Sequence, residues 1–130
     1  MRLLLDTNAF LWAVRKPARL STRARLALED RGNDLIVPAL VPWELAIKYR
    51  LGKLPEAGPV VADYAGTLIG LGARSLPMTH AHTLRAGLLD WDHRDPFDRL
   101  LAATAVVEGL PVVSKDAVFD QLPDLQRIWD

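Results

Sequence analysis

Residues 2–6 read Arg-Leu-Leu-Leu-Asp, a short apolar run that ends at a carboxylate. Two more apolar runs lie further along the chain, within residues 34–38 and at Val112-Val113. Short continuous apolar runs are typical of strands that are covered on both faces of a parallel sheet. We therefore predict three central strands, with residues 74–76 and 127–129 as two further candidate strands.

Helical patterns of apolar residues separate these strands, and glycines 32, 52, 72 and 109 are placed to end four of the helices. The predicted helices cover residues 8–14, 21–30, 42–51, 60–71, 79–89 and 96–108. Strands that alternate with helices indicate βαβ crossovers. The predicted fold class is α/β, an α/β/α sandwich with a short, mainly parallel central sheet of four to five strands.

Length and composition narrow the class of protein. The chain has 130 residues, of which 50% are hydrophobic, so we expect a single domain over residues 1–130. It has no cysteine, which excludes disulfides and thiolate metal sites and favours the reducing cytoplasm. The apolar run near the N-terminus is too short for a signal peptide or a membrane span, so we expect no membrane association.

Four acidic residues lie at the ends of predicted elements. Asp6 and Asp116 follow apolar strands, which places both at the carboxyl edge of a parallel sheet, where open α/β folds bind their ligands. Glu44 and Asp98 each follow a proline by two residues, so we expect both in the first turn of a helix. Four carboxylates brought together would need a counter-ion, and Mg²⁺ or Mn²⁺ is the usual one.

Each acid taken alone also has a structural explanation. An acid in the first helical turn gains about 0.3–1 kcal/mol from the helix dipole, and an acid after a strand can simply be solvated. Asp95 is well placed as a helix N-cap, and Lys48 either orients Glu44 or forms a plain surface ion pair with it. Thr7 and Ser114 flank acids, and their hydroxyls either support a metal site or bond local backbone. It is the four acids together that indicate a metal site.

Charge and aromatic residues leave a nucleic-acid partner possible. The net charge is zero, but setting the four candidate ligands aside leaves 12 acids against 16 Lys and Arg. The densest basic stretch lies within residues 15–25, and it is either a surface for phosphates or for an acidic partner, or a solvated helical face. Trp12 and Trp43 fit apolar helix faces and are predicted in the core, which leaves Trp91 as the better base-stacking candidate. The histidines, predicted on the surface and too scattered for a metal motif, are at positions 80, 82 and 93. An alternative for His93 is that, together with Arg94, it contacts RNA near the site.

Five segments carry a resemblance to a known family. They are Leu-Leu-Leu-Asp-Thr-Asn at 3–8, Trp-Glu-Leu-Ala-Ile-Lys at 43–48, Leu-Gly-Lys-Leu at 51–54, Asp-Pro-Phe-Asp-Arg-Leu-Leu-Ala-Ala-Thr-Ala at 95–105 and Ser-Lys-Asp at 114–116. In this order they resemble a PIN-domain ribonuclease of the VapC toxin type. The resemblance covers essentially the whole chain and implies a PIN-like α/β/α sandwich.

The resemblance also implies a function and a set of site residues. It implies an endoribonuclease dependent on Mg²⁺ or Mn²⁺, the toxin of a type II toxin–antitoxin system, which cuts RNA, dimerises with itself and is held in check by a VapB-like antitoxin. The family's acidic quartet corresponds to Asp6, Glu44, Asp98 and Asp116, both as catalytic residues and as metal ligands. Asn8 stands in place of a small polar residue of the opening motif.

Two other functions stay open from the sequence. An aspartyl phosphatase or phosphotransfer domain would use Asp6 as its nucleophile, but Asn8 stands where that chemistry places a second aspartate. A non-catalytic PIN-like scaffold would bind RNA or a protein without cutting, but such scaffolds lack acids that are all present here. Cleavage of total RNA with Mg²⁺ and with EDTA distinguishes these functions.

Overall fold

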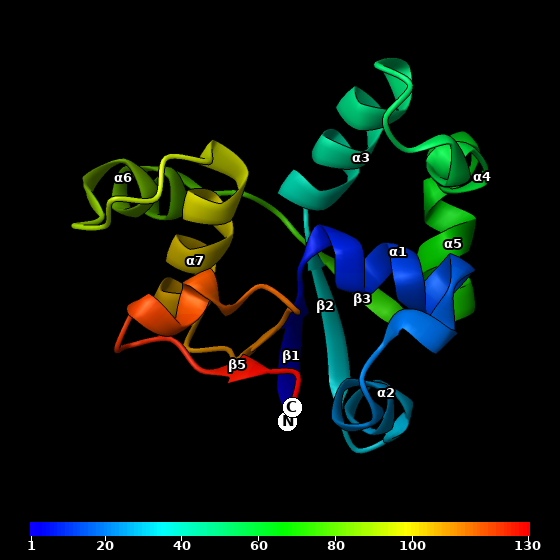
Figure 1. The fold of residues 1–130 in the computed structure, drawn as a ribbon, viewed down its shortest axis with the longest axis horizontal. Helices are drawn as coiled ribbons and strands as arrows, with labels where there is room; N and C mark the ends of the chain where they lie inside the picture. The colour runs from blue at the N-terminus through cyan, green and yellow to red at the C-terminus, as the bar shows by residue number, and fades with distance from the viewer.

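A five-stranded parallel sheet forms the centre of the computed structural model, which describes residues 1–130 (Figure 1). All neighbouring strands pair in parallel, in the order β3-β2-β1-β4-β5. The strands are β1 (Arg2–Leu5), β2 (Asp34–Pro38), β3 (Ala73–Leu76), β4 (Val112–Val113) and β5 (Arg127–Ile128). The predicted α/β class and all five strands are confirmed. The strand order changes direction at β1, so ligands are expected beyond the carboxyl ends of β1 and β4.

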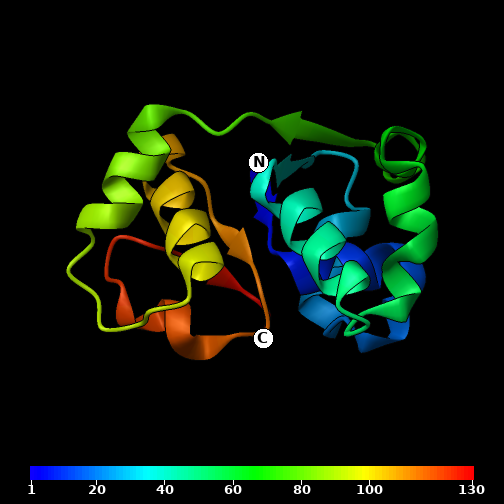
Figure 2. The ribbon, with the colours of Figure 1, turned by 90° about the horizontal axis from the view of Figure 1, so that it is seen from above.

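Helices cover both faces of this sheet, with α6 and α7 on one side and the helices from α1 to α5 on the other (Figures 1 and 2). The helices are α1 (Thr7–Arg15), α2 (Thr22–Glu29), α3 (Leu40–Arg50), α4 (Gly58–Ala62), α5 (Tyr64–Leu71), α6 (His80–Leu88) and α7 (Pro96–Glu108). Three 3₁₀ helices, which were not predicted, are η1 (Pro17–Arg19), η2 (Pro55–Ala57) and η3 (Ala117–Gln121). None of the helices is both long and apolar enough to cross a membrane.

The prediction of one helix over residues 60–71 is wrong. The chain breaks at Asp63, whose φ of −142° is not helical, and α5 begins at the next residue. The Asp63 carboxylate accepts a hydrogen bond from the amide of Gly66 at 3.0 Å, which caps the new helix. An aspartate within an apolar pattern is a possible N-cap, and this signal marks the break.

The predicted start of α3 is also wrong, and the error moves Glu44. The helix begins at Leu40, because Leu40 and Val41 are buried in the core as part of its first turn. Glu44 therefore lies in the second turn, where the helix dipole does not explain it. The matching prediction for α7 is confirmed, since Pro96 is its first residue and Asp98 its third.

Glycine ends three helices as predicted. Gly72 and Gly109 are left-handed caps of α5 and α7, with φ of 71° and 67°, and Gly52 follows α3 with φ of 75°. Gly32 is not a helix cap, because α2 already ends at Glu29. The sharp stops at the other three positions use a backbone conformation that glycine adopts without strain.

One hydrophobic cluster of 24 buried residues lies between the layers. Its centre is β1, where Leu3, Leu4 and Leu5 are fully buried. Each such leucine contributes about 1.5–3 kcal/mol relative to an exposed one. Because β1 is the middle strand, this burial fixes the position of Asp6, the next residue after it.

Two burial predictions are wrong. Trp43 is 59% exposed, because the residues of α3 that face the core are Leu40, Val41, Glu44 and Leu45. His82 is only 1% exposed. It is buried because its ring completes the N-terminal cap of α6: its Nδ1 accepts from the Thr79 amide at 3.0 Å, and its Nε2 lies 2.9 Å from Glu108 on α7.

Candidate active site

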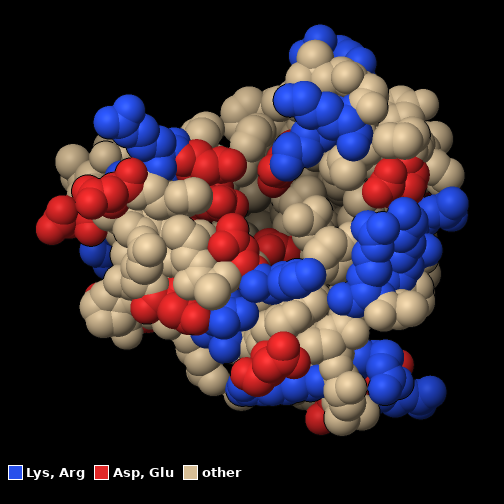
Figure 3. Space-filling model, in the orientation of Figure 1, with Lys and Arg blue, Asp and Glu red and all other residues tan.

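A cavity of about 490 Å³ opens beyond the carboxyl ends of β1 and β4. In the space-filling view, acidic atoms gather in a central hollow and basic atoms lie around it (Figure 3). The structure brings the four predicted acids together here, although they come from four separate segments: Asp6, Glu44, Asp98 and Asp116 all line the cavity. A fifth acid, Asp95, was predicted only as a helix cap and lines the same cavity.

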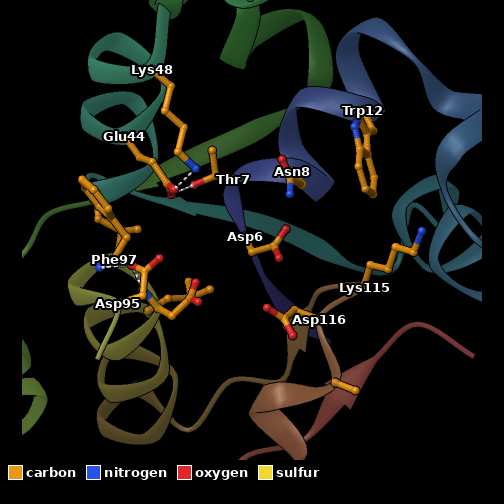
Figure 4. Close-up of a pocket in the computed structure, with 14 residues that line it drawn as sticks. Asp6, Thr7, Asn8, Trp12, Glu44, Lys48, Asp95, Phe97, Lys115 and Asp116 are labelled. Atoms are coloured by element: carbon orange, nitrogen blue, oxygen red, sulfur yellow. Dashed lines mark hydrogen bonds and ion pairs between the residues drawn. The ribbon is translucent and has the colours of Figure 1, made fainter. Parts of the chain in front are cut away.

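Asp6 lies near the middle of the cavity in the close-up view (Figure 4). One of its oxygens accepts a hydrogen bond from the Ala9 amide at 2.7 Å, so the residue also caps α1. Burial raises the pKa of Asp6 from 3.8 to about 6, and the charges of Asp98 and Glu44 add to this increase. The Ser114 hydroxyl and the Ala9 amide lower this pKa but do not offset the burial. Burial therefore favours the protonated form of Asp6, and a cation nearby would favour the ionised form.

Glu44 is held by a contact on each of its two oxygens. The Thr7 hydroxyl donates a 2.5 Å hydrogen bond to Oε1, and the Lys48 ammonium lies 2.6 Å from Oε2 (Figure 4). The Glu44 residue is 8% exposed. Lys48 is therefore not the partner in a plain surface ion pair, because the carboxylate that it contacts is buried in the cavity wall.

Asp98 occupies the first turn of α7, and its Oδ2 lies 2.7 Å from Nε2 of His93. Burial raises the pKa of Asp98, and the charges of Asp95 and Asp116 raise it further, while the hydrogen bond and charge of His93 lower it. His93 was predicted on the surface, with a position near the site as the alternative, and the structure places it beside this acid. The Asp95 carboxylate caps α7 as predicted, since it accepts from the amides of Phe97 and Asp98.

Asp116 is the most exposed of the four acids and follows β4 through a tight turn. Its amide donates a 3.0 Å hydrogen bond to the hydroxyl of Ser114, which is fully buried. Its carboxylate accepts from the Val118 amide at 3.0 Å and so caps η3. Asn8 also lines the cavity, one turn of α1 away from Trp12 (Figure 4).

The side chains around the cavity leave an excess of negative charge. Five carboxylates line it against two lysines, Lys48 and Lys115. No three acidic or histidine side chains are close enough to form a ready-made metal site. Glu44 and Asp98 are instead each held at the wall by a neighbouring side chain.

Arg99 is a site residue that the sequence did not reveal. Its guanidinium donates to the backbone oxygens of Ala86, Leu89, Trp91 and His93, over distances of 2.7–3.1 Å. These bonds fix the segment between α6 and α7, which carries His93 and leads into the first turn of α7, where Asp98 lies. The only signal in the sequence is an arginine in an otherwise apolar stretch of α7, directly after Asp98.

Comparison with known proteins defines the class. Residues 3–125 match the sequence model of the PIN domain family. The chain belongs to the PIN domain family. It is 32% identical to Ribonuclease VapC22 of Mycobacterium tuberculosis over 114 residues, which are 87% of this chain and 85% of that protein. It is 37% identical to Ribonuclease VapC16 of the same organism over 59 residues, and this match spans only 45% of the chain and 42% of that protein.

Solved structures share the fold at lower sequence identity. The structure of VapBC2 from Rickettsia felis, bound to a DNA fragment from its promoter, has a TM-score of 0.69 at 21% identity and covers 100% of both chains. FitAcB from Neisseria gonorrhoeae has a TM-score of 0.63 at 22% identity and covers 96% of this chain and 95% of that one. Both therefore have the same arrangement of strands and helices as this protein.

Proposed function

We propose that this protein is a metal-dependent endoribonuclease of the VapC type, which hydrolyses RNA phosphodiester bonds with a metal-activated water. The observation that carries the proposal is the meeting of Asp6, Glu44, Asp98 and Asp116 in one cavity of a PIN fold. The match to VapC22 over most of both chains supports the same activity.

The residues of the cavity fit a divalent cation. Its donors are carboxylate oxygens, the ligands that Mg²⁺ and Mn²⁺ prefer. Burial, with a smaller contribution from neighbouring carboxylates, raises the pKa of Asp6 and of Asp98, and a bound cation would favour the ionised form of both. Mg²⁺ usually keeps several waters and takes one or two carboxylates directly, so it does not need three side chains already in contact. Asp6, Glu44 and Asp98 would hold the ion, with Asp116 as a further ligand.

When bound, the cation would supply a water of lowered pKa and compensate charge on the phosphoryl oxygens. The protein's own residues would prepare this site in three ways. Thr7 and Lys48 hold Glu44 in one orientation, and His93 does the same for Asp98. Lys48 and Lys115 stand at the cavity, where an RNA phosphate would meet a positive charge.

The two other functions are less well supported. A phosphatase that used Asp6 as nucleophile would want a second acid two residues on, and Asn8 lines the cavity at that place. A non-catalytic scaffold does not need five carboxylates in one cavity. Their mutual repulsion destabilises the fold, and RNA binding alone does not require them.

We also propose the partners and the compartment that VapC proteins have. The similar structures include VapBC2 from Rickettsia felis and VapBC-5 from Mycobacterium tuberculosis. We accordingly propose that this chain binds a VapB-like antitoxin and forms a homodimer. A cationic side chain of the antitoxin would fit the acidic cavity. The absence of cysteine supports action in the cytoplasm.

The test is cleavage of total RNA by the purified protein with Mg²⁺, with Mn²⁺ and with EDTA. We expect products with 5′-phosphate ends that appear only with a divalent cation. Asp98→Asn should abolish them, whereas Asp124→Asn, at an exposed acid outside the cavity, should not. Hydrolysis of small phosphate esters without RNA cleavage would favour the phosphatase, and RNA binding without cleavage would favour the scaffold.

A further inference from the structure

Trp43 is the most exposed tryptophan of the four in the chain. It is 59% exposed, whereas Trp12 and Trp91 are half-buried and Trp129 is buried. A single exposed apolar residue is common on protein surfaces, so exposure alone assigns no role. The position of Trp43 next to Phe97, at the edge of the cavity, indicates a role.

The Trp43 ring contacts Phe97, with ring centroids 5.0 Å apart and planes at 65°. This pair joins α3 to α7, the two helices that carry Glu44 and Asp98. Trp43 directly precedes Glu44, and Phe97 directly precedes Asp98. The aromatic pair is therefore fixed to the same helical turns as two of the proposed metal ligands.

The pair extends from the cavity to the protein surface. Phe97 lines the cavity, and Trp43 continues beyond it into solvent. The two rings meet edge-on, and the 59% exposure of Trp43 leaves much of its indole accessible to a base. Two lysines also line the cavity. Lys48 of α3 lies at its wall, paired with Glu44, and Lys115 lies across from it (Figure 4). A strand of RNA that leaves the cavity past Phe97 would thus meet an exposed aromatic surface on which a base can stack.

We propose that Trp43, braced by Phe97, stacks on an unpaired base next to the cleaved phosphate and so selects single-stranded RNA. This inference rests on the proposed ribonuclease function. Base–aromatic stacking needs a free base face, which a duplex does not offer. Trp91 does not fit this role, because it packs on Phe119 and His93 and its Nε1 donates to Gln121.

The experiment measures the affinity of a short labelled single-stranded RNA by fluorescence anisotropy with Mg²⁺ present. All variants carry Asp6→Asn, so that the RNA is not cut. Trp43→Ala should weaken binding about 5- to 150-fold, the range that stacking on one base covers. Trp43→Phe should keep most of the affinity. Ile69→Ala, at an 80% exposed residue of α5, is the matched control and should leave it unchanged.

A second measurement separates stacking from a general loss of structure. One base next to the cut site is replaced by an abasic nucleotide, and its effect is compared in the parent and in Trp43→Ala. If Trp43 stacks directly on that base, the abasic nucleotide and Trp43→Ala together weaken binding no more than either change alone. Binding of the matching duplex RNA should not depend on Trp43.

The inference is overturned if Trp43→Ala binds single-stranded RNA as the parent does, or if the abasic and Trp43→Ala effects simply add. A Trp43→Ala variant that no longer binds an antitoxin but keeps its RNA affinity would show that Trp43 and Phe97 contact a protein. That result would overturn the inference as well. These failures leave the ribonuclease proposal standing when the unmodified protein still cuts RNA. If the unmodified protein neither cuts nor binds RNA, both proposals fall.

Discussion

Thr7 and Glu44 are 37 positions apart in the sequence, and the Thr7 hydroxyl donates a 2.5 Å hydrogen bond to Oε1 of Glu44. Thr7 follows Asp6 at the end of the central strand, and Glu44 lies on α3. The bond therefore ties two of the four clustered acids into one rigid unit. Lys48 completes this unit at the other oxygen of Glu44.

Thr7→Val should weaken this unit. The change keeps the shape of the side chain but leaves Oε1 of a buried carboxylate without its donor, which should lower the free energy of unfolding by about 1–3 kcal/mol. Chemical denaturation measures this, with Thr83→Val at an exposed threonine of α6 as control. Equal stability of the Thr7 variant and the wild type would show that the hydrogen bond carries no free energy.

The pH dependence of stability should reveal the raised pKa of Asp6. Between its ordinary pKa of 3.8 and its folded pKa of about 6, the folded protein binds more protons at Asp6 than the unfolded chain does. The contribution of Asp6 to the free energy of unfolding is therefore most favourable at low pH, where the residue is protonated, and it is lost as the pH rises from about 4 to about 6. The pKa difference corresponds to about 3 kcal/mol.

The measurement is denaturation of the wild type and of Asp6→Asn in EDTA from pH 4 to pH 7. Asp6→Asn cannot ionise, so it should gain stability relative to the wild type across this range. A constant difference between the two proteins would mean that burial does not raise the pKa of Asp6.

Arg99→Lys should destabilise the segment that carries His93. A lysine has no planar fork of donors, so several of the four backbone oxygens now bound by Arg99 would lose their partners. We expect a loss of at least about 2 kcal/mol in the free energy of unfolding, together with faster amide exchange in the segment before α7. Arg94→Lys, at an exposed arginine of the same segment, should change neither.

The positions of the two acids that follow strands could be predicted from the sequence. Asp6 and Asp116 follow apolar runs, and parallel pairing brings the ends of such runs to one edge whatever the surrounding detail. Glu44 reached the same cavity although its predicted place in the helix was wrong. Its helix starts earlier because the burial of Leu40 decides the boundary, and burial depends on tertiary packing.

The contacts that orient the acids could not be predicted. His93 contacts Asp98 from a segment whose backbone is held by Arg99, and no local sequence pattern predicts the conformation of that segment. Trp43 is exposed because the residues of α3 that pack into the core are Leu40, Val41, Glu44 and Leu45, and position 43 lies outside that buried face. Each of these features depends on which neighbours the complete fold supplies.

The central claim is that the clustered carboxylates act together as one cation site, and Mn²⁺ binding measured by isothermal titration calorimetry tests it most directly. The account predicts binding to the wild type and to Asp124→Asn, and its loss or strong weakening in both Asp6→Asn and Asp98→Asn. Equal Mn²⁺ affinity in all four proteins would contradict it.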